Sequence, residues 1–253
     1  MTSSTSKNKN SLFYIILVSL ILGGIVRIAY LWVYPVPVRD AYTYCEFIGE
    51  WISSGRIPED AGGGFPPLGL YLFKQTGTIL NLDIIKSGTI VNMLAGLLII
   101  ATLGTIAHTI IPFSPFVLGV SLVSATHPRL VDYSCQATRE NTYLLFTGLS
   151  ILFFIRYLKS NDRLCLVVVS AVFACAAFLC RHEGFELLIL ANCVILLYQK
   201  KPILKRLKTV LLFSATYVLS FFLISQLIGV PLSYYGSSYT RRYSEIILSG
   251  DNR

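Results

Sequence analysis

Three short charged stretches stand out in an apolar chain, and each combines an acidic residue with a basic one. They are Arg39-Asp40, Arg139-Glu140 and Arg181-His182-Glu183. An ionisable residue at the mouth of a membrane segment is a functional candidate by default, because such residues tend to face a cavity and pair with a substrate or with one another. We expect Asp40 to be the centre of a membrane-embedded active site. The alternative for each stretch is a self-neutralising, structural ion pair.

The types of these residues predict a particular reaction. A carboxylate can take a proton from a hydroxyl nucleophile in the transition state. Arginine side chains hold phosphate through two parallel hydrogen bonds, and they neutralise the charge of a departing phosphate. Together these groups predict the transfer of a group from a lipid phosphate to an acceptor hydroxyl outside the cytoplasm.

The composition is typical of a membrane protein. The chain of 253 residues is 54% hydrophobic and 13% charged, whereas a soluble domain carries roughly 25% charged residues. Its mean hydropathy is +0.66. The net charge of +8 could indicate a nucleic-acid partner, but the basic residues lie between apolar runs rather than on one polar face. We interpret them as topology signals and expect no nucleic-acid partner.

The apolar runs predict an all-α polytopic membrane protein with about seven transmembrane helices. The expected spans are 12–34, 88–110, 113–127, 142–158, 163–180, 184–199 and 209–229. The segment 35–86 is the first large loop between spans, and we expect it to hold two amphipathic helices on the membrane surface. In the first of these, apolar residues recur at helical spacing from Tyr44 to Trp51, and the second covers 65–80.

Basic residues in the short loops set the expected orientation. With Lys7 and Lys9 in the cytoplasm, the same side receives the basic loops at 156–163 and 200–208, as the positive-inside rule requires. No small-residue cleavage site follows the first apolar run, so we interpret that run as a retained signal-anchor. All three charged stretches then lie on the extracytoplasmic side. The expected organisation is a cytoplasmic tail at 1–10, a transmembrane module at 11–230 and an extracytoplasmic tail at 231–253.

Three other features leave alternatives open. Arg27 interrupts the first apolar run, and we expect it either to extend towards the interface or to contact a lipid phosphate. Cys45 and Cys135 both lie on the expected outer side, where a disulfide between them is possible. The spacing of the six cysteines matches no metal-binding motif. His108 is interpreted as a packed or interfacial residue.

The order and sidedness of these features resemble the GT-C glycosyltransferases. The likeness rests on three stretches, which are Arg39-Asp40-Ala41-Tyr42 after the first span, Phe65-Pro66-Pro67-Leu68-Gly69-Leu70-Tyr71, and Leu179-Cys180-Arg181-His182-Glu183-Gly184. The nearest branch is the bacterial dolichyl-phosphate-mannose-protein mannosyltransferase-like group, glycosyltransferase family 39. The resemblance covers nearly the whole chain, because the shared GT-C module has about this pattern of spans, with two surface helices in its first loop.

The resemblance implies an integral enzyme of the plasma (inner) membrane that takes a sugar from a polyprenyl-phosphate donor and inverts the anomeric centre. The acceptor could be a protein, a lipid or a glycan. Asp40 matches the first-loop acid of the family and would be the catalytic base. Arg39 and Tyr42 beside it would belong to the substrate-binding site.

The same resemblance implies roles for residues at the ends of later spans. Arg139 and Glu140 match a polar position at the head of a span, and Arg181 matches an arginine before the sixth span. By this analogy the arginines would hold the carrier phosphate. His182 and Glu183 would order the site, although His182 also fits a plain interfacial residue.

Two departures from the family pattern keep other functions open. Many relatives carry an acidic pair in the first loop, whereas Ala41 follows Asp40 here, so the sequence does not support a divalent metal and no other cofactor is expected. Relatives also often continue with further spans or a soluble domain, whereas this chain ends at Arg253. The alternatives are a polyprenyl-phosphate-binding subunit without activity and a small multi-pass transporter. A transporter would more often show charged or Gly/Pro-broken segments near the midplane.

Overall fold

Helices account for every regular element in the part of the chain that the structure describes. This computed structural model describes residues 3–34, 37–58, 65–160, 163–199 and 201–235, with the backbone alone for 3–10 and Arg39. Four helices are long and apolar enough to cross a membrane. They are Ser11–Val33 within α1 (Ser3–Val33), Ile84–Ile110 (α4), Glu140–Lys159 (α7) and Ile203–Leu227 (α10). The chain is therefore a membrane-embedded helical protein.

The other three expected spans are shorter helices. They are α5 (Ser114–Thr126), α8 (Leu164–Cys180) and α9 (Phe185–Tyr198), of 13, 17 and 14 residues. A helix that crosses the hydrocarbon core needs roughly 20 residues. The number of seven spans and the orientation therefore stay predictions.

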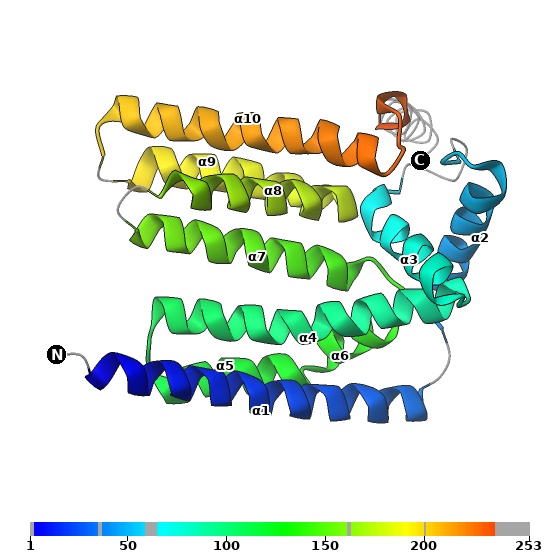
Figure 1. Ribbon diagram of the computed structural model, residues 1–253, viewed down its shortest axis with the longest axis horizontal. Helices are drawn as coiled ribbons and strands as arrows, with labels where there is room; N and C mark the ends of the chain where they lie inside the picture. The colour runs from blue at the N-terminus through cyan, green and yellow to red at the C-terminus, as the bar shows by residue number, and fades with distance from the viewer. Residues whose placement is uncertain (1–2, 35–36, 59–64, 161–162, 200, 236–253) are drawn as a thin grey trace, which may run out of the picture.

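The long helices lie side by side along one axis, and two shorter helices from the first loop lie across one end of them (Figure 1). These two are α2 (Arg39–Ser54) and α3 (Pro67–Leu80). The short helix α6 (Pro128–Cys135) follows α5 and leads the chain back to the start of α7. The end of the bundle under α2 and α3 receives all three charged stretches of the sequence.

Local chemistry sets the limits of the helices in the first loop. Gly55 ends α2 in a left-handed conformation, with φ of 68°, which glycine adopts without strain. Pro67 occupies the first turn of α3, where its missing N–H is not needed. Asp83 caps the start of α4, because its carboxylate accepts a hydrogen bond of 2.9 Å from the backbone N–H of Lys86.

The apolar face of α2 is buried inside the protein, although we expected it to rest on the membrane surface. Tyr44, Phe47 and Trp51 are at most 3% exposed. The rings of Tyr44 and Phe47 contact Phe65 edge to face, and Trp51 lies 6.1 Å from the ring of Tyr71 in α3. Aromatic partners within the same loop therefore cover the face that was expected to meet lipid.

Arg27 was expected to reach the interface or a lipid phosphate, and the structure contradicts both expectations. Its side chain is fully buried, and Nη1 donates hydrogen bonds to the carbonyl oxygens of Gly23 and Ala125. The guanidinium therefore joins α1 to the end of α5. The disulfide between Cys45 and Cys135 does not form either, because both are free and Cys135 is buried with its thiol donating to the Arg27 carbonyl.

Asn92 of α4 holds the segment that leads into α7. Its side chain is fully buried, and Nδ2 donates to the carbonyl oxygens of Gln136 and Thr138. Asn141 in the first turn of α7 donates in return to the backbone carbonyl of Asn92, at 3.0 Å. These bonds fix the position of Arg139, which lies between the two contacts.

The first prediction concerns this hydrogen-bonded connection. Asn92→Leu removes a donor from the carbonyl oxygens of Gln136 and Thr138, although the Gln136 carbonyl still accepts from the backbone N–H of Thr138. We therefore expect the free energy of unfolding to fall by about 1–3 kcal/mol. Thr105→Val on the same helix is the control, because the Thr105 hydroxyl bonds only Ala101 of its own helix, and it should change stability by about 0.5 kcal/mol or less. The measurement is thermal unfolding in detergent. Equal stability of the two variants would contradict the assignment.

Candidate functional site

Arg181 joins two of the charged stretches. Its Nη1 lies 2.9 Å from Oε1 of Glu140, the first residue of α7, and its Nη2 lies 2.8 Å from Oε1 of Glu183. A further bond of 3.3 Å from Nε to Glu183 Oε2 makes the second contact bidentate. These contacts raise the pKa of Arg181 and hold the pKa of Glu183 below its usual range, in both residues mainly through the hydrogen bond between them.

The turn after α8 positions Arg181 and Glu183, and its conformation requires glycine at position 184. Arg181 has an extended backbone, and His182–Gly184 then form a short 3-10 turn (η1) that leads into α9. A Cβ at Gly184 would lie 2.2 Å from the backbone nitrogen of Phe178 and 2.5 Å from the carbonyl carbon of Ala177. Only glycine therefore allows the chain to fold back against the last turn of α8 with Arg181 facing α7.

Arg139 is turned away from Glu140, its neighbour in sequence, and contacts α2. Its Nε donates a hydrogen bond of 3.0 Å to the hydroxyl of Tyr44, and its guanidinium carbon lies 5.1 Å and 5.0 Å from the ring centres of Tyr44 and Phe65. These distances are those of cation–π contacts. Gly69 of α3 packs closely beside this group, since a Cβ there would lie 3.2 Å from Oγ1 of Thr142 and at an ordinary contact distance of 3.6 Å from Cγ of Arg139.

Several polar atoms at this end of the bundle are buried without a partner among the described residues. They include Nη1 of Arg139, Oε2 of Glu140 and Oγ1 of Thr138. A buried polar group without a hydrogen bond is expensive. The open N–H of Arg139 could be satisfied by an acceptor group of a ligand, and the open oxygen of Glu140 by a donor group.

Asp40 lies in the first turn of α2, exposed to solvent. Within the described residues its carboxylate makes no hydrogen bond or ion pair. It is one helical turn before Tyr44, and side chains four residues apart lie on the same side of a helix. Burial raises the pKa of Tyr44, the nearby Arg139 opposes this rise, and the charges of Glu140 and Asp40 add to it. Asp40 is thus close enough to act electrostatically on the group that binds Arg139.

The remaining residues predicted for the site are placed as follows. Tyr42 is 52% exposed, and no contact of its side chain with the charged cluster is found in the described part. His182 is half-buried with its ring 6.0 Å from that of Phe178, and its role as a site residue or a plain interfacial residue stays a prediction. The side chain of Arg39 lies outside the described residues.

The sequence alone missed three aromatic residues of the site. Tyr44 was identified only as part of an apolar face, whereas its hydroxyl binds Arg139. Phe65 lies under the same guanidinium, and the hydroxyl of Tyr234 donates to the Phe65 carbonyl oxygen at 2.9 Å. Burial raises the pKa of Tyr234, and Arg139 acts against this rise. The signal that could have found Tyr44 is its spacing of four residues from Asp40.

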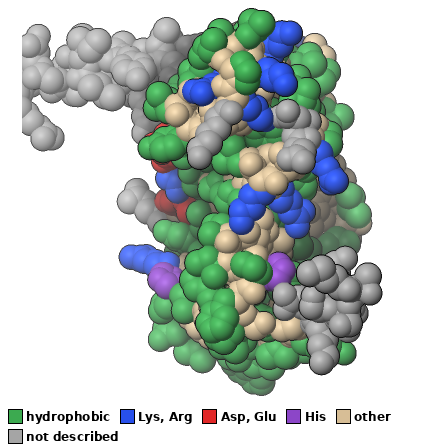
Figure 2. Space-filling view, turned by 90° about the vertical axis from the view of Figure 1, so that its left-hand side faces the viewer, with side chains coloured by type: hydrophobic (Ala, Val, Ile, Leu, Met, Phe, Trp, Pro, Cys, Tyr) green, Lys and Arg blue, Asp and Glu red, His purple; other side chains and the backbone are tan. Residues whose placement is uncertain are grey.

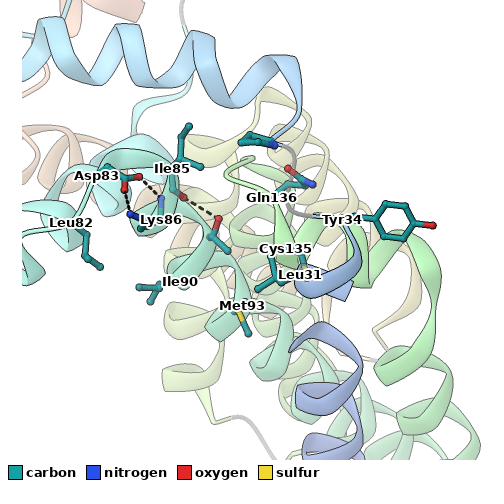
Figure 3. A pocket seen from close by; sticks show the side chains of 12 residues that line it. Leu31, Tyr34, Leu82, Asp83, Ile85, Lys86, Ile90, Met93, Cys135 and Gln136 are labelled. Carbon is teal, nitrogen blue, oxygen red and sulfur yellow. Dashed lines mark hydrogen bonds and ion pairs between the residues drawn. The ribbon is translucent and has the colours of Figure 1, made fainter. Parts of the chain in front are cut away.

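An apolar cavity of about 690 Å³ adjoins the connection between α1 and α2 (Figure 3). Leu31, Ile90, Met93 and Cys135 are among the residues that form its walls. The pair Asp83 and Lys86 lies at the same cavity, with 2.8 Å between Nζ and Oδ2. The remaining lining residues are Tyr34, Pro37, Leu82, Ile85, Thr89 and Gln136.

Gln136 links this cavity to the start of α2. Its Oε1 accepts a hydrogen bond of 3.1 Å from the backbone N–H of Val38, two residues before Asp40. The cavity lining includes Gln136 but neither Arg139 nor Arg181. The apolar space therefore lies next to the polar cluster and is separate from it.

Comparison with protein-family models, with curated proteins and with solved structures gives no match. Among the described residues no three His, Cys, Asp or Glu side chains lie together as metal ligands would. The arrangement of residues therefore carries the argument about function, and the resemblance to GT-C glycosyltransferases stays a prediction.

The second prediction follows from the lowered pKa of Glu183. A carboxylate whose pKa is lower in the folded protein stabilises the fold above its unfolded pKa, and this contribution is lost as the pH falls through the folded value. Glu183→Gln should therefore lower the melting temperature at neutral pH, by the equivalent of about 1 kcal/mol or less because the pair is partly exposed. The difference from wild type should close on acidification.

The control is Glu186→Gln, because Glu186 is exposed and has no described partner. This variant should follow the wild-type pH profile of the melting temperature. If the melting temperatures of wild type and Glu183→Gln differ by the same amount at neutral and at acidic pH, the Arg181–Glu183 pair does not stabilise the fold in this way.

Proposed function

We propose that this chain is an integral membrane glycosyltransferase, which transfers a sugar from a polyprenyl-phosphate-linked donor to an extracytoplasmic acceptor hydroxyl with inversion. The observation that carries the proposal is the half-buried Arg139, whose Nη1 is buried and unsatisfied and whose Nε contacts Tyr44 of α2, the helix that bears Asp40. An unpaired cation and an exposed carboxylate at one end of a membrane bundle are the two groups that this reaction needs.

The two arginines have different capacities for a phosphate. Arg181 already contacts two carboxylates through Nε, Nη1 and Nη2. Arg139 contacts only a neutral hydroxyl and two aromatic rings among the described residues. At Arg139 a phosphate would meet a cation that no described carboxylate neutralises. At Arg181 it would compete with two carboxylates. We therefore assign the donor phosphate to Arg139 and a positioning role to Arg181.

The reaction would proceed as a single displacement. The acceptor hydroxyl attacks the anomeric carbon on the face opposite the phosphate, while Asp40 takes its proton. The bond between the anomeric carbon and the phosphate oxygen breaks, and its electron pair leaves with the polyprenyl phosphate. Arg139 stabilises the charge that develops on the departing phosphate. The open Oε2 of Glu140 is available to accept a hydrogen bond from a sugar hydroxyl.

The apolar cavity supports a lipid-linked donor. Its lining surface is mainly apolar, and it lies beside the Val38–Gln136 contact at the start of α2. A polyprenyl chain in this cavity would place its phosphate near the start of α2, the helix that carries Asp40. The opposite, basic end of the bundle would face the cytoplasm, with the N-terminus on the same side.

The third prediction is tested with the purified chain in lipid and a panel of radiolabelled polyprenyl-phosphate sugars. Wild type should consume one donor, and Asp40→Asn should slow this reaction on the order of a hundredfold or more, because the general base is lost. Glu46→Gln is the matched control, since Glu46 is another exposed carboxylate of α2, and it should react at nearly the wild-type rate.

Arg139→Gln separates donor binding from the chemical step. We expect it to weaken binding of polyprenyl phosphate, whereas Asp40→Asn should leave that binding unchanged. If wild type consumes no donor and both wild type and Asp40→Asn bind polyprenyl phosphate equally, the enzyme proposal fails. The chain would then act as a lipid-carrier-binding subunit without activity.

A further inference from the structure

The end of the bundle opposite the candidate site carries a hollow lined by lysines. It has a volume of about 280 Å³ and lies between the starts of α8 and α10, where Lys201, Lys205 and Lys208 surround it. Its other lining residues are Leu164, Leu212 and Thr209. Figure 2 looks onto this end and shows basic side chains spread over it, with acidic ones only at its edge.

Two other basic residues at this end, Lys159 and Arg206, have structural partners. Lys159 donates from Nζ to the carbonyl oxygens of Thr109 and Ile110 at the end of α4. Arg206 donates to the carbonyl oxygens of Lys201 and Leu196, each at 2.7 Å, and so closes the turn between α9 and α10. Both occupy helix C-terminal carbonyls, as basic side chains commonly do.

The lysines of the hollow are arranged differently. Lys201 is held in place, because its Nζ lies 3.2 Å from the Tyr157 hydroxyl and 4.8 Å from the centre of that ring. Lys205 and Lys208 are exposed and have no partner among the described residues. They lie three residues apart on the same face of α10, where like charges repel.

The sequence offers little negative charge to balance these lysines. From 187 to 244 it contains no acidic residue, and from 141 to 182 it contains only Asp162, which lies outside the described residues. The hollow itself is lined by no carboxylate. An external anion is therefore the natural counter-charge for Lys205 and Lys208, which have no partner among the described residues.

The surroundings of the hollow favour an anion that is part of a lipid. The lysines lie in the first turns of the candidate membrane helix α10 or just before it, and the end of a spanning helix lies at the level of the headgroups. Leu164 and Leu212 provide apolar walls beside the ammonium groups. Basic pockets between transmembrane helices on the cytoplasmic side are known to suit anionic headgroups.

We propose that this hollow is a binding site for an anionic phospholipid of the cytoplasmic leaflet. The phosphodiester contacts Lys205 and Lys208, Lys201 flanks it from its fixed position on Tyr157, and the first part of an acyl chain lies against Leu164 and Leu212. The site is independent of the proposed transferase activity, and it anchors the basic end of the bundle at the headgroup layer.

The fourth prediction is tested by native mass spectrometry of the full chain in detergent, titrated with phosphatidylglycerol or phosphatidylcholine. Wild type should retain the anionic lipid in preference to the neutral one. Lys205→Gln/Lys208→Gln should weaken retention of phosphatidylglycerol on the order of tenfold. The matched control is Lys7→Gln/Lys9→Gln, which removes the same charge from the same expected side of the membrane and should keep nearly wild-type retention.

Two outcomes would overturn the proposal, and a competition arm separates the sources of phosphate. Equal loss in both double variants would mean diffuse attraction by the basic end, and no loss in either would mean no site. Inorganic phosphate and glycerophosphoglycerol are added as competitors that lack acyl chains. We expect neither to displace the lipid at equal concentration, and displacement by either would assign the hollow to a soluble phosphate instead.

Discussion

The Arg181 guanidinium lies between the carboxylates of Glu140 and Glu183, and the candidate site depends on this arrangement. Glu140 begins α7 and Glu183 lies in the turn between α8 and α9, so one side chain joins the start of α7 to the turn that follows α8. Charges near a bilayer require such internal partners, because uncompensated ones are expensive. Glu140 forms its ion pair with Arg181 and not with Arg139. Arg139 instead donates a hydrogen bond to Tyr44 of α2.

This division of partners gives the two arginines different functions. Arg181 is neutralised and holds the geometry, whereas Arg139 keeps a buried, unsatisfied N–H group. The aromatic rings of Tyr44 and Phe65 position the Arg139 guanidinium without neutralising its charge. A site of this kind is preorganised for an anionic ligand. Asp40 lies one turn from Tyr44 on the helix that Arg139 contacts, so this single helix carries both the carboxylate that we propose as the base and the hydroxyl that binds the proposed phosphate-binding arginine.

The sequence predicted the helices and the region of the site better than the contacts within it. Apolar runs and turn residues located the helices, because helix formation depends on local spacing and on residues such as Gly55 and Pro67. The convergence of the charged stretches at one end followed from the order of the expected spans. The alternative of an ion pair within each stretch holds for Arg181 and Glu183. It does not hold for Arg139 and Glu140, because these adjacent side chains point apart and Glu140 meets a partner 41 residues away. The contacts of Arg27 could not be predicted from the sequence either, because one of its acceptors is a backbone carbonyl of α5 that helix packing brings near.

The two ends of the bundle carry different kinds of charge, and each end has its own proposed ligand. One end combines acids with arginines beside an apolar cavity, and the other gathers lysines with almost no acid. The most direct test is a structure of the full chain in lipid with polyprenyl phosphate bound. The account predicts the phosphate within hydrogen-bond distance of Arg139 Nη1, with the Arg181 contacts to Glu140 and Glu183 intact. A phosphate bound away from Arg139, or one that displaces a carboxylate from Arg181, would contradict it.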